Sequence, residues 1–389
     1  MTLRRMTVQP NVLEWARRTA GLPVDEAAKR IGVSPLRIDE WEAGTLEPTI
    51  TQLRNAADAY DRPFGAMFLE SPPDNEEIFD LPDFRRPSNA GVESAALRRS
   101  ILRAHRQQEA LQDVLDEGSE LGLPTAQIIN LSIEDPPGKS AKRIRDELGL
   151  SGLRSRDFAD PERLLRWLVR TVESRGYLVI QTQRVPIDEM RGFSLAGGAA
   201  PIIALNGADW PRGKIYTLLH ELAHVGLRHS GLCDLSRESK KPEERYCDAV
   251  AAAVLMPAGS FKEAAMNSDP IDYRSLRELA SSFGASAEAA LIRMVHLGLA
   301  TWEQYFEMKP VFREAYVKYK QDERSAAEGK DPPPIYYQLK VRDLGRPFVQ
   351  TVLRAHDDGA LSARDVTNLL EISYDKVPKL AQLSGVVGL

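Results

Sequence analysis

The sequence contains little cysteine and no long hydrophobic run. Only two cysteines occur in 389 residues, which argues against a secreted domain held together by disulfides. No uninterrupted apolar stretch approaches the roughly 18 residues of a membrane-spanning helix. The basic residues 1–5 are not followed by the apolar core of a signal peptide. The sequence therefore predicts a protein of the cytoplasm that does not associate with membranes.

The chain also lacks a strong excess of one charge and an internal repeat of fixed period. Its formal net charge is −5 and 43% of its residues are hydrophobic, which is typical of a globular protein. A chain of this length can form two or three domains. We expect a multidomain, mainly α-helical protein with a small β-sheet. The predicted parts are residues 1–70, 71–138, 139–270 and 271–389.

The pattern HExxH at residues 220–224 is the strongest chemical signal in the sequence. Residues four apart lie on one face of a helix, so His220 and His224 can direct two imidazoles to one metal ion. Glu221 lies about 100° further round the helix, beside the metal rather than on it. This pattern is typical of a Zn²⁺ site in which the glutamate serves as general base.

Glu244 is the predicted third ligand, because a catalytic zinc is held by three protein ligands. It begins a helix expected over residues 244–256, which Pro257 ends. Asp248 lies one turn later, where its carboxylate could hold the outer N–H of a ligand histidine. The alternative is that the motif is a solvated polar face. Apolar flanking residues disfavour it, because buried imidazoles and carboxylates are costly without a partner.

These segments resemble the ImmA/IrrE family of metallopeptidases, whose active-site plan is similar to that of thermolysin-like gluzincins. The resemblance implies a gluzincin-like α+β zinc domain in which His220, His224 and Glu244 are metal ligands and Glu221 is catalytic. Asp248 stands where the family usually has asparagine, and it fits the gluzincin ExxxD pattern. The resemblance is carried by residues 191–194, 201–206, 217–224 and 244–257.

Two further expectations concern the surroundings of this site. Residues 176–182 and 201–206 are predicted to be strands, the second beside the zinc helix. In zincins such a strand lets a peptide substrate add alongside it by β-augmentation. The strand can also be a plain core strand, and the two interpretations are compatible. Cys247, which replaces a small residue of the family, is predicted to pack in the core rather than bind metal.

The first 70 residues have the helix pattern of a DNA-binding domain. Two short helices end at Gly32 and Gly44, and Ser34 is a predicted N-cap before Pro35. The segment resembles the Xre/Cro-type helix-turn-helix, a five-helix bundle in which the helix beginning at Ser34 enters the major groove. The resemblance suggests base contacts by Ser34, Arg37 and Gln52 and phosphate contacts by Arg17 and Arg18.

The charge of this segment is low for a DNA-binding domain. It contains nine basic and ten acidic side chains, although phosphate neutralisation supplies much of the affinity for DNA. Asp39 and Glu40 lie on the predicted reading helix, where they would repel phosphate unless paired. The alternative is that this bundle docks on a protein or on the rest of the chain.

The remaining segments are predicted to be linkers and helices. Residues 71–77 and 321–334 are expected to be Pro-containing, charged linkers, residues 81–87 extended, and residues 271–389 a mostly helical region. A long polar helix is expected over residues 95–120, as a coiled-coil spacer, a homodimer contact or a solvated connection.

The predicted function is that of a regulatory zinc endopeptidase that cleaves a repressor-type protein, or itself, to control transcription. The helix-turn-helix in the same chain is predicted to bind double-stranded DNA. The rival hypothesis from another class is a non-enzymatic transcription regulator that uses the zinc domain as a sensor or scaffold.

Overall fold

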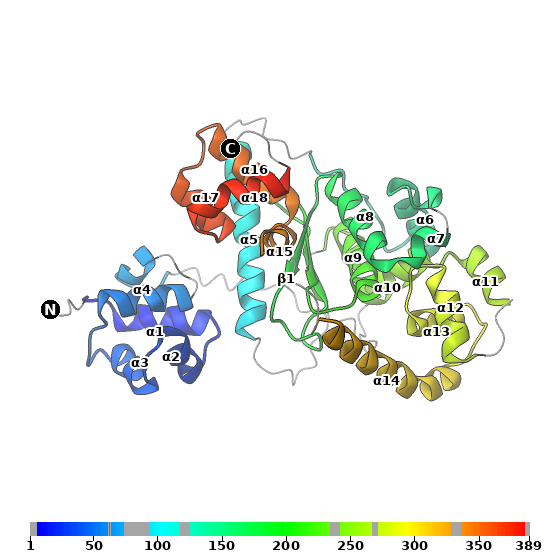
Figure 1. The fold of residues 1–389 in the computed structure, drawn as a ribbon, viewed down its shortest axis with the longest axis horizontal. Coiled ribbons are helices and arrows are strands. Elements are labelled where there is room, and N and C mark those ends of the chain that lie inside the picture. The colour runs from blue at the N-terminus through cyan, green and yellow to red at the C-terminus, as the bar shows by residue number, and fades with distance from the viewer. Residues whose placement is uncertain are drawn as a thin grey trace. The chain divides into compact units, whose positions relative to one another are not determined.

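The computed structural model describes residues 6–60, 62, 64–73, 94–116, 125–153, 155–198, 200–229, 231–233, 242–266, 271–327 and 336–385. The chain divides into two compact units, one of Met1–Asp80 and Arg86–Arg103 and one of Leu81–Arg85 and Ala104–Leu389. Helix α5 (Ala95–Asp116) crosses the division (Figure 1). The four-part division proposed from sequence stays a prediction. None of the helices in the described ranges combines the length and apolar character of a membrane span.

The first unit contains the predicted helix-turn-helix bundle, whose fifth helix is a short 3-10 helix. Its core includes Ile38, Trp41, Leu53 and Met67. Gly32, at φ +81°, ends the second helix in the left-handed conformation that glycine adopts without steric cost. The helices are α1 (Pro10–Thr19), α2 (Val24–Ile31), α3 (Pro35–Glu42), α4 (Ile50–Ala59) and η1 (Phe64–Phe68).

The second unit is built on a four-stranded sheet of order β1-β3-β2-β4. Strand β3 (Ile202–Asn206) runs parallel to β1 (Leu178–Thr182) and antiparallel to β2 (Gly192–Leu195), which in turn pairs with β4 (Gly231–Cys233). The expectation that a substrate strand adds alongside residues 201–206 was wrong, because β1 and β2 already use both edges of β3. Every residue of β3 is buried, as in a core strand.

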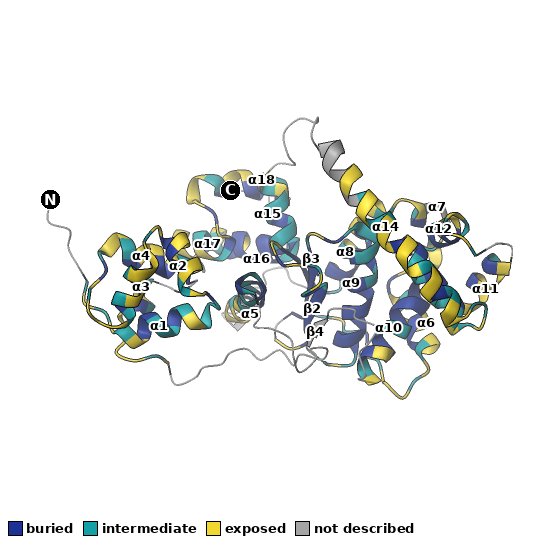
Figure 2. Cartoon of the chain, turned by 90° about the horizontal axis from the view of Figure 1, so that it is seen from below, coloured by how far each residue is buried: buried dark blue, intermediate teal, exposed yellow. Residues whose placement is uncertain are grey.

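Helix α9 (Pro211–Gly226) lies against this sheet and against α8 and α10. Pro211 is suited to its first turn, where no N–H partner is needed. Residues 217–226 are all buried, and Figure 2 shows α9 in dark blue along most of its length. The neighbouring helices are α6 (Pro137–Glu147), η2 (Leu150–Gly152), α7 (Ser155–Ala159), α8 (Pro161–Glu173) and α10 (Pro242–Leu255).

Helices follow α10 to the end of the described chain, in keeping with the mostly helical region predicted from residue 271. The expected linker at residues 321–334 is wrong in its first part, because α14 continues as a helix to Ala327; residues 328–335 lie outside the described ranges. The helices are α11 (Ala258–Met266), α12 (Tyr273–Ser281), α13 (Ala287–His296), α14 (Trp302–Ala327), α15 (Tyr336–Leu344), α16 (Arg346–Asp357), α17 (Ala363–Leu370), η3 (Tyr374–Lys376) and α18 (Val377–Ser384).

Helix α5 is not a solvated connection in its second half. Leu111 and Val114 are buried. The Gln107 side chain donates to the carbonyl of Leu344 at 3.0 Å, and Gln108 donates to the carbonyl of Gly197 at 2.6 Å. This half of α5 therefore packs on the second unit. The predicted linker at residues 71–77 is described only to residue 73, and the extended segment at residues 81–87 lies outside the described residues.

Candidate metal centre

The two histidines and the glutamate predicted as ligands lie together in the second unit. His220 and His224 come from one face of α9, and Glu244 comes from the first turn of α10. All three are at most 1% exposed. Their donor atoms all lie within 4.8 Å of one another. The three residues that the sequence spacing predicted as ligands therefore meet in one buried donor set.

The separations of the donor atoms are close to those expected around one metal ion. The Nε2 atoms of the two histidines lie 3.0 Å apart, Glu244 Oε2 lies 3.3 Å from His220 Nε2, and Glu244 Oε1 lies 3.2 Å from His224 Nε2. Bonds of about 2.0–2.1 Å to a tetrahedral metal would separate its ligand atoms by about 3.3–3.4 Å. Two imidazole nitrogens and a carboxylate oxygen at these separations fit a divalent cation.

Asp248 lies where the sequence spacing predicted it, one turn after Glu244 on α10. Its Oδ1 atom is 2.9 Å from Nδ1 of His220, on the side of the ring opposite Nε2. Tyr216, four residues before His220, donates its hydroxyl to the Asp248 carbonyl at 3.0 Å and lies 3.4 Å from Oδ1. The contact between Asp248 and His220 Nδ1 favours the imidazole tautomer that leaves Nε2 free to bind a metal.

Glu221 lies beside the donor set and points to strand β2. The hydroxyl of Ser194 donates to Glu221 Oε2 at 2.9 Å. Within the described part of the chain, Oε1 is buried without a hydrogen-bond partner. Burial raises the pKa of Glu221, and the neighbouring His224, His220 and Ser194 oppose part of that rise. A carboxylate with a raised pKa and one unengaged oxygen is suited to accept and return a proton.

The charges of the donor set depend strongly on one another. Burial alone would lower the pKa of His220, but Asp248, Glu244 and Glu221 together raise it to about 9. Burial acts to raise the pKa of Glu244, but its hydrogen bonds with His220 and His224 outweigh burial and lower it. A positive charge between the acidic side chains thus stabilises their ionised forms. A proton or a divalent cation can supply that charge. Metal affinity must therefore fall as pH falls.

Gly192 on β2 allows α9 to approach the sheet closely. A Cβ atom at this position would overlap Thr217 Cγ2 and lie 3.0 Å from the carbonyl of Ala204 and 3.2 Å from Glu221 Oε1. We predict that Gly192→Ala lowers the free energy of unfolding by about 1–3 kcal/mol, as overpacking does, and displaces Glu221. Urea unfolding would measure the loss.

Gly138→Ala is the matched control for this substitution. Gly138 lies in the first turn of α6, and a Cβ atom there would meet no atom within 4 Å. Alanine also favours the helix, so this variant should be as stable as the wild type or slightly more stable. Equal stability of both variants would show that the approach of α9 to β2 has room for a side chain.

Sequence reasoning missed three residues of this site. Ser194 contacts the predicted base, Tyr216 contacts Asp248, and Gly192 makes room for α9 to lie close to the sheet. Residues 191–194 were noted only as part of a family resemblance, and no strand was predicted there. Cys247 is buried in the hydrophobic core and is not part of the described donor set, as the core-packing prediction expected.

The residues predicted to contact DNA lie in different settings in the first unit. Ser34 is exposed at the N-cap position of α3, without a side-chain capping bond. Arg37 lies 3.6 Å from Glu40, which supplies the pairing that this acid needs. Gln52 is half-buried, and its Oε1 accepts from the Thr49 N–H in a capping box. Arg18 is exposed and lies 3.4 Å from Glu14.

Arg17 is placed differently from the phosphate contact expected of it. Its Nε and Nη2 atoms donate to the two carboxylate oxygens of Glu42 at 2.6 and 2.7 Å, and both side chains are nearly buried. A third bond runs from Nη1 to the carbonyl of Leu22. This bidentate pair joins α1 to α3 inside the bundle, so Arg17 cannot reach a phosphate without breaking it.

The second unit has a metallopeptidase-like domain: two histidines of one helix and a glutamate of the next could hold a metal, and the first of these helices packs on a small sheet. The first unit is a helix-turn-helix domain. Comparison with known families agrees with both. Residues 176–295 match the family described as the IrrE N-terminal-like domain, and residues 13–66 match the helix-turn-helix family. The resemblance inferred from sequence is thus confirmed: the chain joins a helix-turn-helix to a domain of the ImmA/IrrE type. No match was found among curated proteins.

Proposed function

We propose that this protein is a regulatory zinc-dependent endopeptidase that cleaves a repressor-type protein, or itself, to control transcription. The observation that carries the proposal is the convergence of His220, His224 and Glu244 on one buried point, with Glu221 beside it. Two imidazoles and a carboxylate are a common ligand set of catalytic zinc. The helix-turn-helix in the same chain supports a role in transcription.

Each residue of the site has a role in the proposed mechanism. His220, His224 and Glu244 would hold the zinc ion, which supplies Lewis acidity toward a scissile carbonyl and makes a water at the site more acidic. Glu221 takes the proton of the attacking water and returns it to the leaving amine. Ser194 holds Glu221 through Oε2, which leaves Oε1 without a hydrogen-bond partner among the described residues. Asp248 and Tyr216 hold the His220 ring in place.

A comparison of cellular proteins would test this function. Cells that carry the active chain should contain one truncated repressor-like protein that is absent from cells carrying Glu221→Gln. The variant differs by one isosteric side chain, so both cell lines keep the same helix-turn-helix. The same fragments in both lines would contradict the proposal. A fragment of the chain itself would identify self-cleavage instead of cleavage of a partner.

The second candidate function is a DNA-binding regulator that needs no peptidase activity. The match of residues 13–66 to the helix-turn-helix family favours it. Arg37 lies near the start of α3, the helix that such domains place in the major groove. Affinity for DNA should fall steeply with salt concentration if phosphates are neutralised.

We predict that Arg37→Ala weakens specific DNA binding by about 1–3 kcal/mol, the range for loss of one good base contact. A mobility-shift assay with a salt titration would measure it. Arg163→Ala, an exposed arginine of α8 in the other unit, is the control. If Arg37→Ala binds specific DNA as tightly as the wild type, Arg37 does not contact a base.

A further inference from the structure

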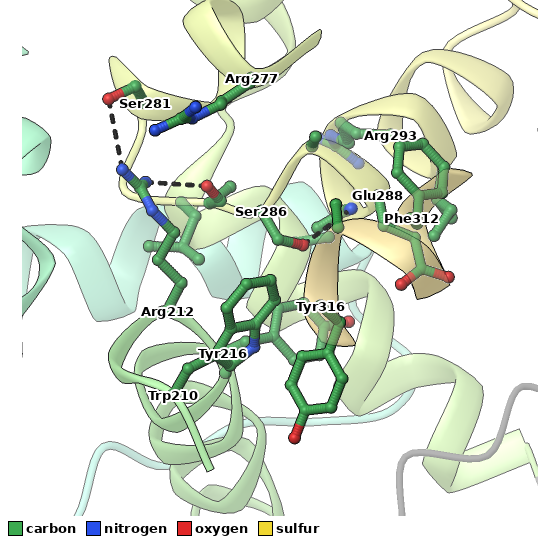
Figure 3. A pocket seen from close by; sticks show the side chains of 18 of the residues that line it. Trp210, Arg212, Tyr216, Arg277, Ser281, Ser286, Glu288, Arg293, Phe312 and Tyr316 are labelled. Carbon is green, nitrogen blue, oxygen red and sulfur yellow. Dashed lines mark hydrogen bonds between the residues drawn. The ribbon is translucent and has the colours of Figure 1, made fainter. Parts of the chain in front are cut away.

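The second unit contains a large cavity whose lining includes neither the donor set nor the predicted base. It has a volume of about 2080 Å³ and is walled by the start of α9, one side of α10, and helices α12, α13 and α14. Figure 3 shows Trp210, Tyr216 and Tyr316 on one side and Arg212 and Arg277 on another. Tyr216 and Asp248 line the cavity, whereas the three residues of the donor set and Glu221 do not.

The lining of the cavity is basic. Nine arginine and lysine side chains line it, but only four aspartate and glutamate side chains do, although the whole chain has a net charge of −5. Three of the four acids are already engaged: Glu278 pairs with Arg274, Asp248 lies against His220, and Glu288 accepts a hydrogen bond from Tyr305. Of the basic side chains, Arg274 is taken up by the first of these pairs and Arg191 pairs with Asp209. Positive charge gathered in a concave surface attracts and concentrates ligands of the opposite sign.

Arg212 and Arg277 form the most distinctive part of this lining. Arg212 is half-buried and donates to the carbonyl of Ala285 at 2.8 Å and to the hydroxyl of Ser281 at 3.2 Å. Burial, and then the nearby charge of Arg277, lower the pKa of Arg212. In the described part of the chain neither guanidinium has an ion pair with a carboxylate. Two neighbouring cations without an anion are stabilised by an anionic ligand.

The size of the cavity indicates the kind of ligand. Pockets for small molecules usually have volumes of about 300–1,000 Å³, and this cavity is about twice the upper value. A polypeptide segment fills such a space better than a metabolite does. The aromatic wall, in which Trp210 packs edge-on against Tyr316 with ring centroids 5.3 Å apart, offers apolar contact to side chains between the charged groups.

We propose that this cavity is a docking site for an acidic polypeptide segment, with Arg212 and Arg277 as its main anchor for carboxylates. The polar lining suits a peptide better than a nucleic acid. Glu278, Glu288 and Asp322 lie in the same wall. They can accept the backbone N–H groups that a peptide offers between its acidic side chains, whereas a nucleic acid strand has a negative charge at every nucleotide and no backbone N–H. The partner is thus a protein with an exposed run of aspartate or glutamate.

The cavity shares one wall with the metal centre. The Tyr216 hydroxyl contacts Asp248, and Asp248 contacts His220 Nδ1, so a segment bound here would lie against the residues that orient a metal ligand. An acidic partner held at this wall is close to the centre without competing for the ligands themselves. The binding proposal itself needs no peptidase activity, and it can be tested in a chain that cannot cleave.

The test measures binding of a labelled glutamate-rich peptide to the full-length chain carrying Glu221→Gln, by fluorescence anisotropy. The same peptide with glutamine in place of glutamate is the reference ligand. We expect the acidic peptide to bind at least about tenfold more tightly, with an affinity that falls as salt rises. Arg277→Glu should weaken binding by about tenfold or more, because it places a negative charge in the anchor.

Arg364→Glu, an exposed position on α17 outside the cavity, makes the same charge change and should leave binding unchanged. Lys318→Glu, on the α14 side of the cavity, is the second test variant, and melting curves check that each variant is folded. Equal affinity for the two peptides, or equal losses in Arg277→Glu and Arg364→Glu, would overturn the proposal. So would a single-stranded oligonucleotide that binds more tightly than the peptide and is released by Arg277→Glu.

Discussion

The Glu221→Gln variant should lose cleavage of a peptide substrate by about 10²–10⁴-fold, the usual contribution of a general base. Glutamine keeps the shape of the side chain and can still accept the bond from Ser194, but it cannot take a proton from water. The donor atoms of His220, His224 and Glu244 are untouched, so bound metal should stay near one equivalent. Metal analysis and a cleavage assay on the same preparation would measure both quantities.

The His224→Ala variant separates loss of the base from loss of the metal. It removes one of three donor atoms and should release the metal together with the activity. If Glu221→Gln cleaves as fast as the wild type, Glu221 is not the base. If His224→Ala keeps its metal, the donor set proposed above is incorrect. The two variants therefore test the base and the ligands separately.

Glu173 should make the second unit less stable as pH rises. This residue ends α8 and is 8% exposed. Burial raises its pKa to about 8, although the charge and backbone N–H of Arg346 and the charge of Arg170 oppose the rise. Below the ordinary pKa of 4.5 the group is protonated in both the folded and the unfolded chain. Between 4.5 and about 8 the unfolded chain releases its proton while the folded chain keeps it.

The contribution of Glu173 is therefore complete below pH 4.5 and is lost as pH rises to about 8. The full loss is on the order of 5 kcal/mol. Glu173→Gln stays neutral at every pH and should remove this loss, so the variant should resemble the wild type near pH 5 and be more stable above pH 8. Urea unfolding at a series of pH values would measure it; parallel curves for both proteins would contradict the raised pKa.

The sequence by itself determined the parts of this protein that depend on local periodicity. A helix repeats every 3.6 residues, so the four-residue steps from His220 to His224 and from Glu244 to Asp248 fix which side chains share a face. Apolar residues on most sides of residues 215–225 predicted that this helix is buried, as it is. Gly32, Gly44 and Pro257 predicted the ends of three helices to within two residues. The ligand set and its supporting carboxylate could thus be proposed without a structure.

Only the tertiary structure decided which groups from distant segments meet. The pairing of β3 on both edges excludes substrate addition there, and no local pattern distinguishes an inner strand from an edge strand. The bridge from Arg17 to Glu42 joins residues of separate helices, and it turns an expected phosphate contact into an internal one. The contacts of Ser194 with Glu221 and of Arg212 with Ala285 likewise join separate elements, because long-range packing, not helical spacing, sets these distances.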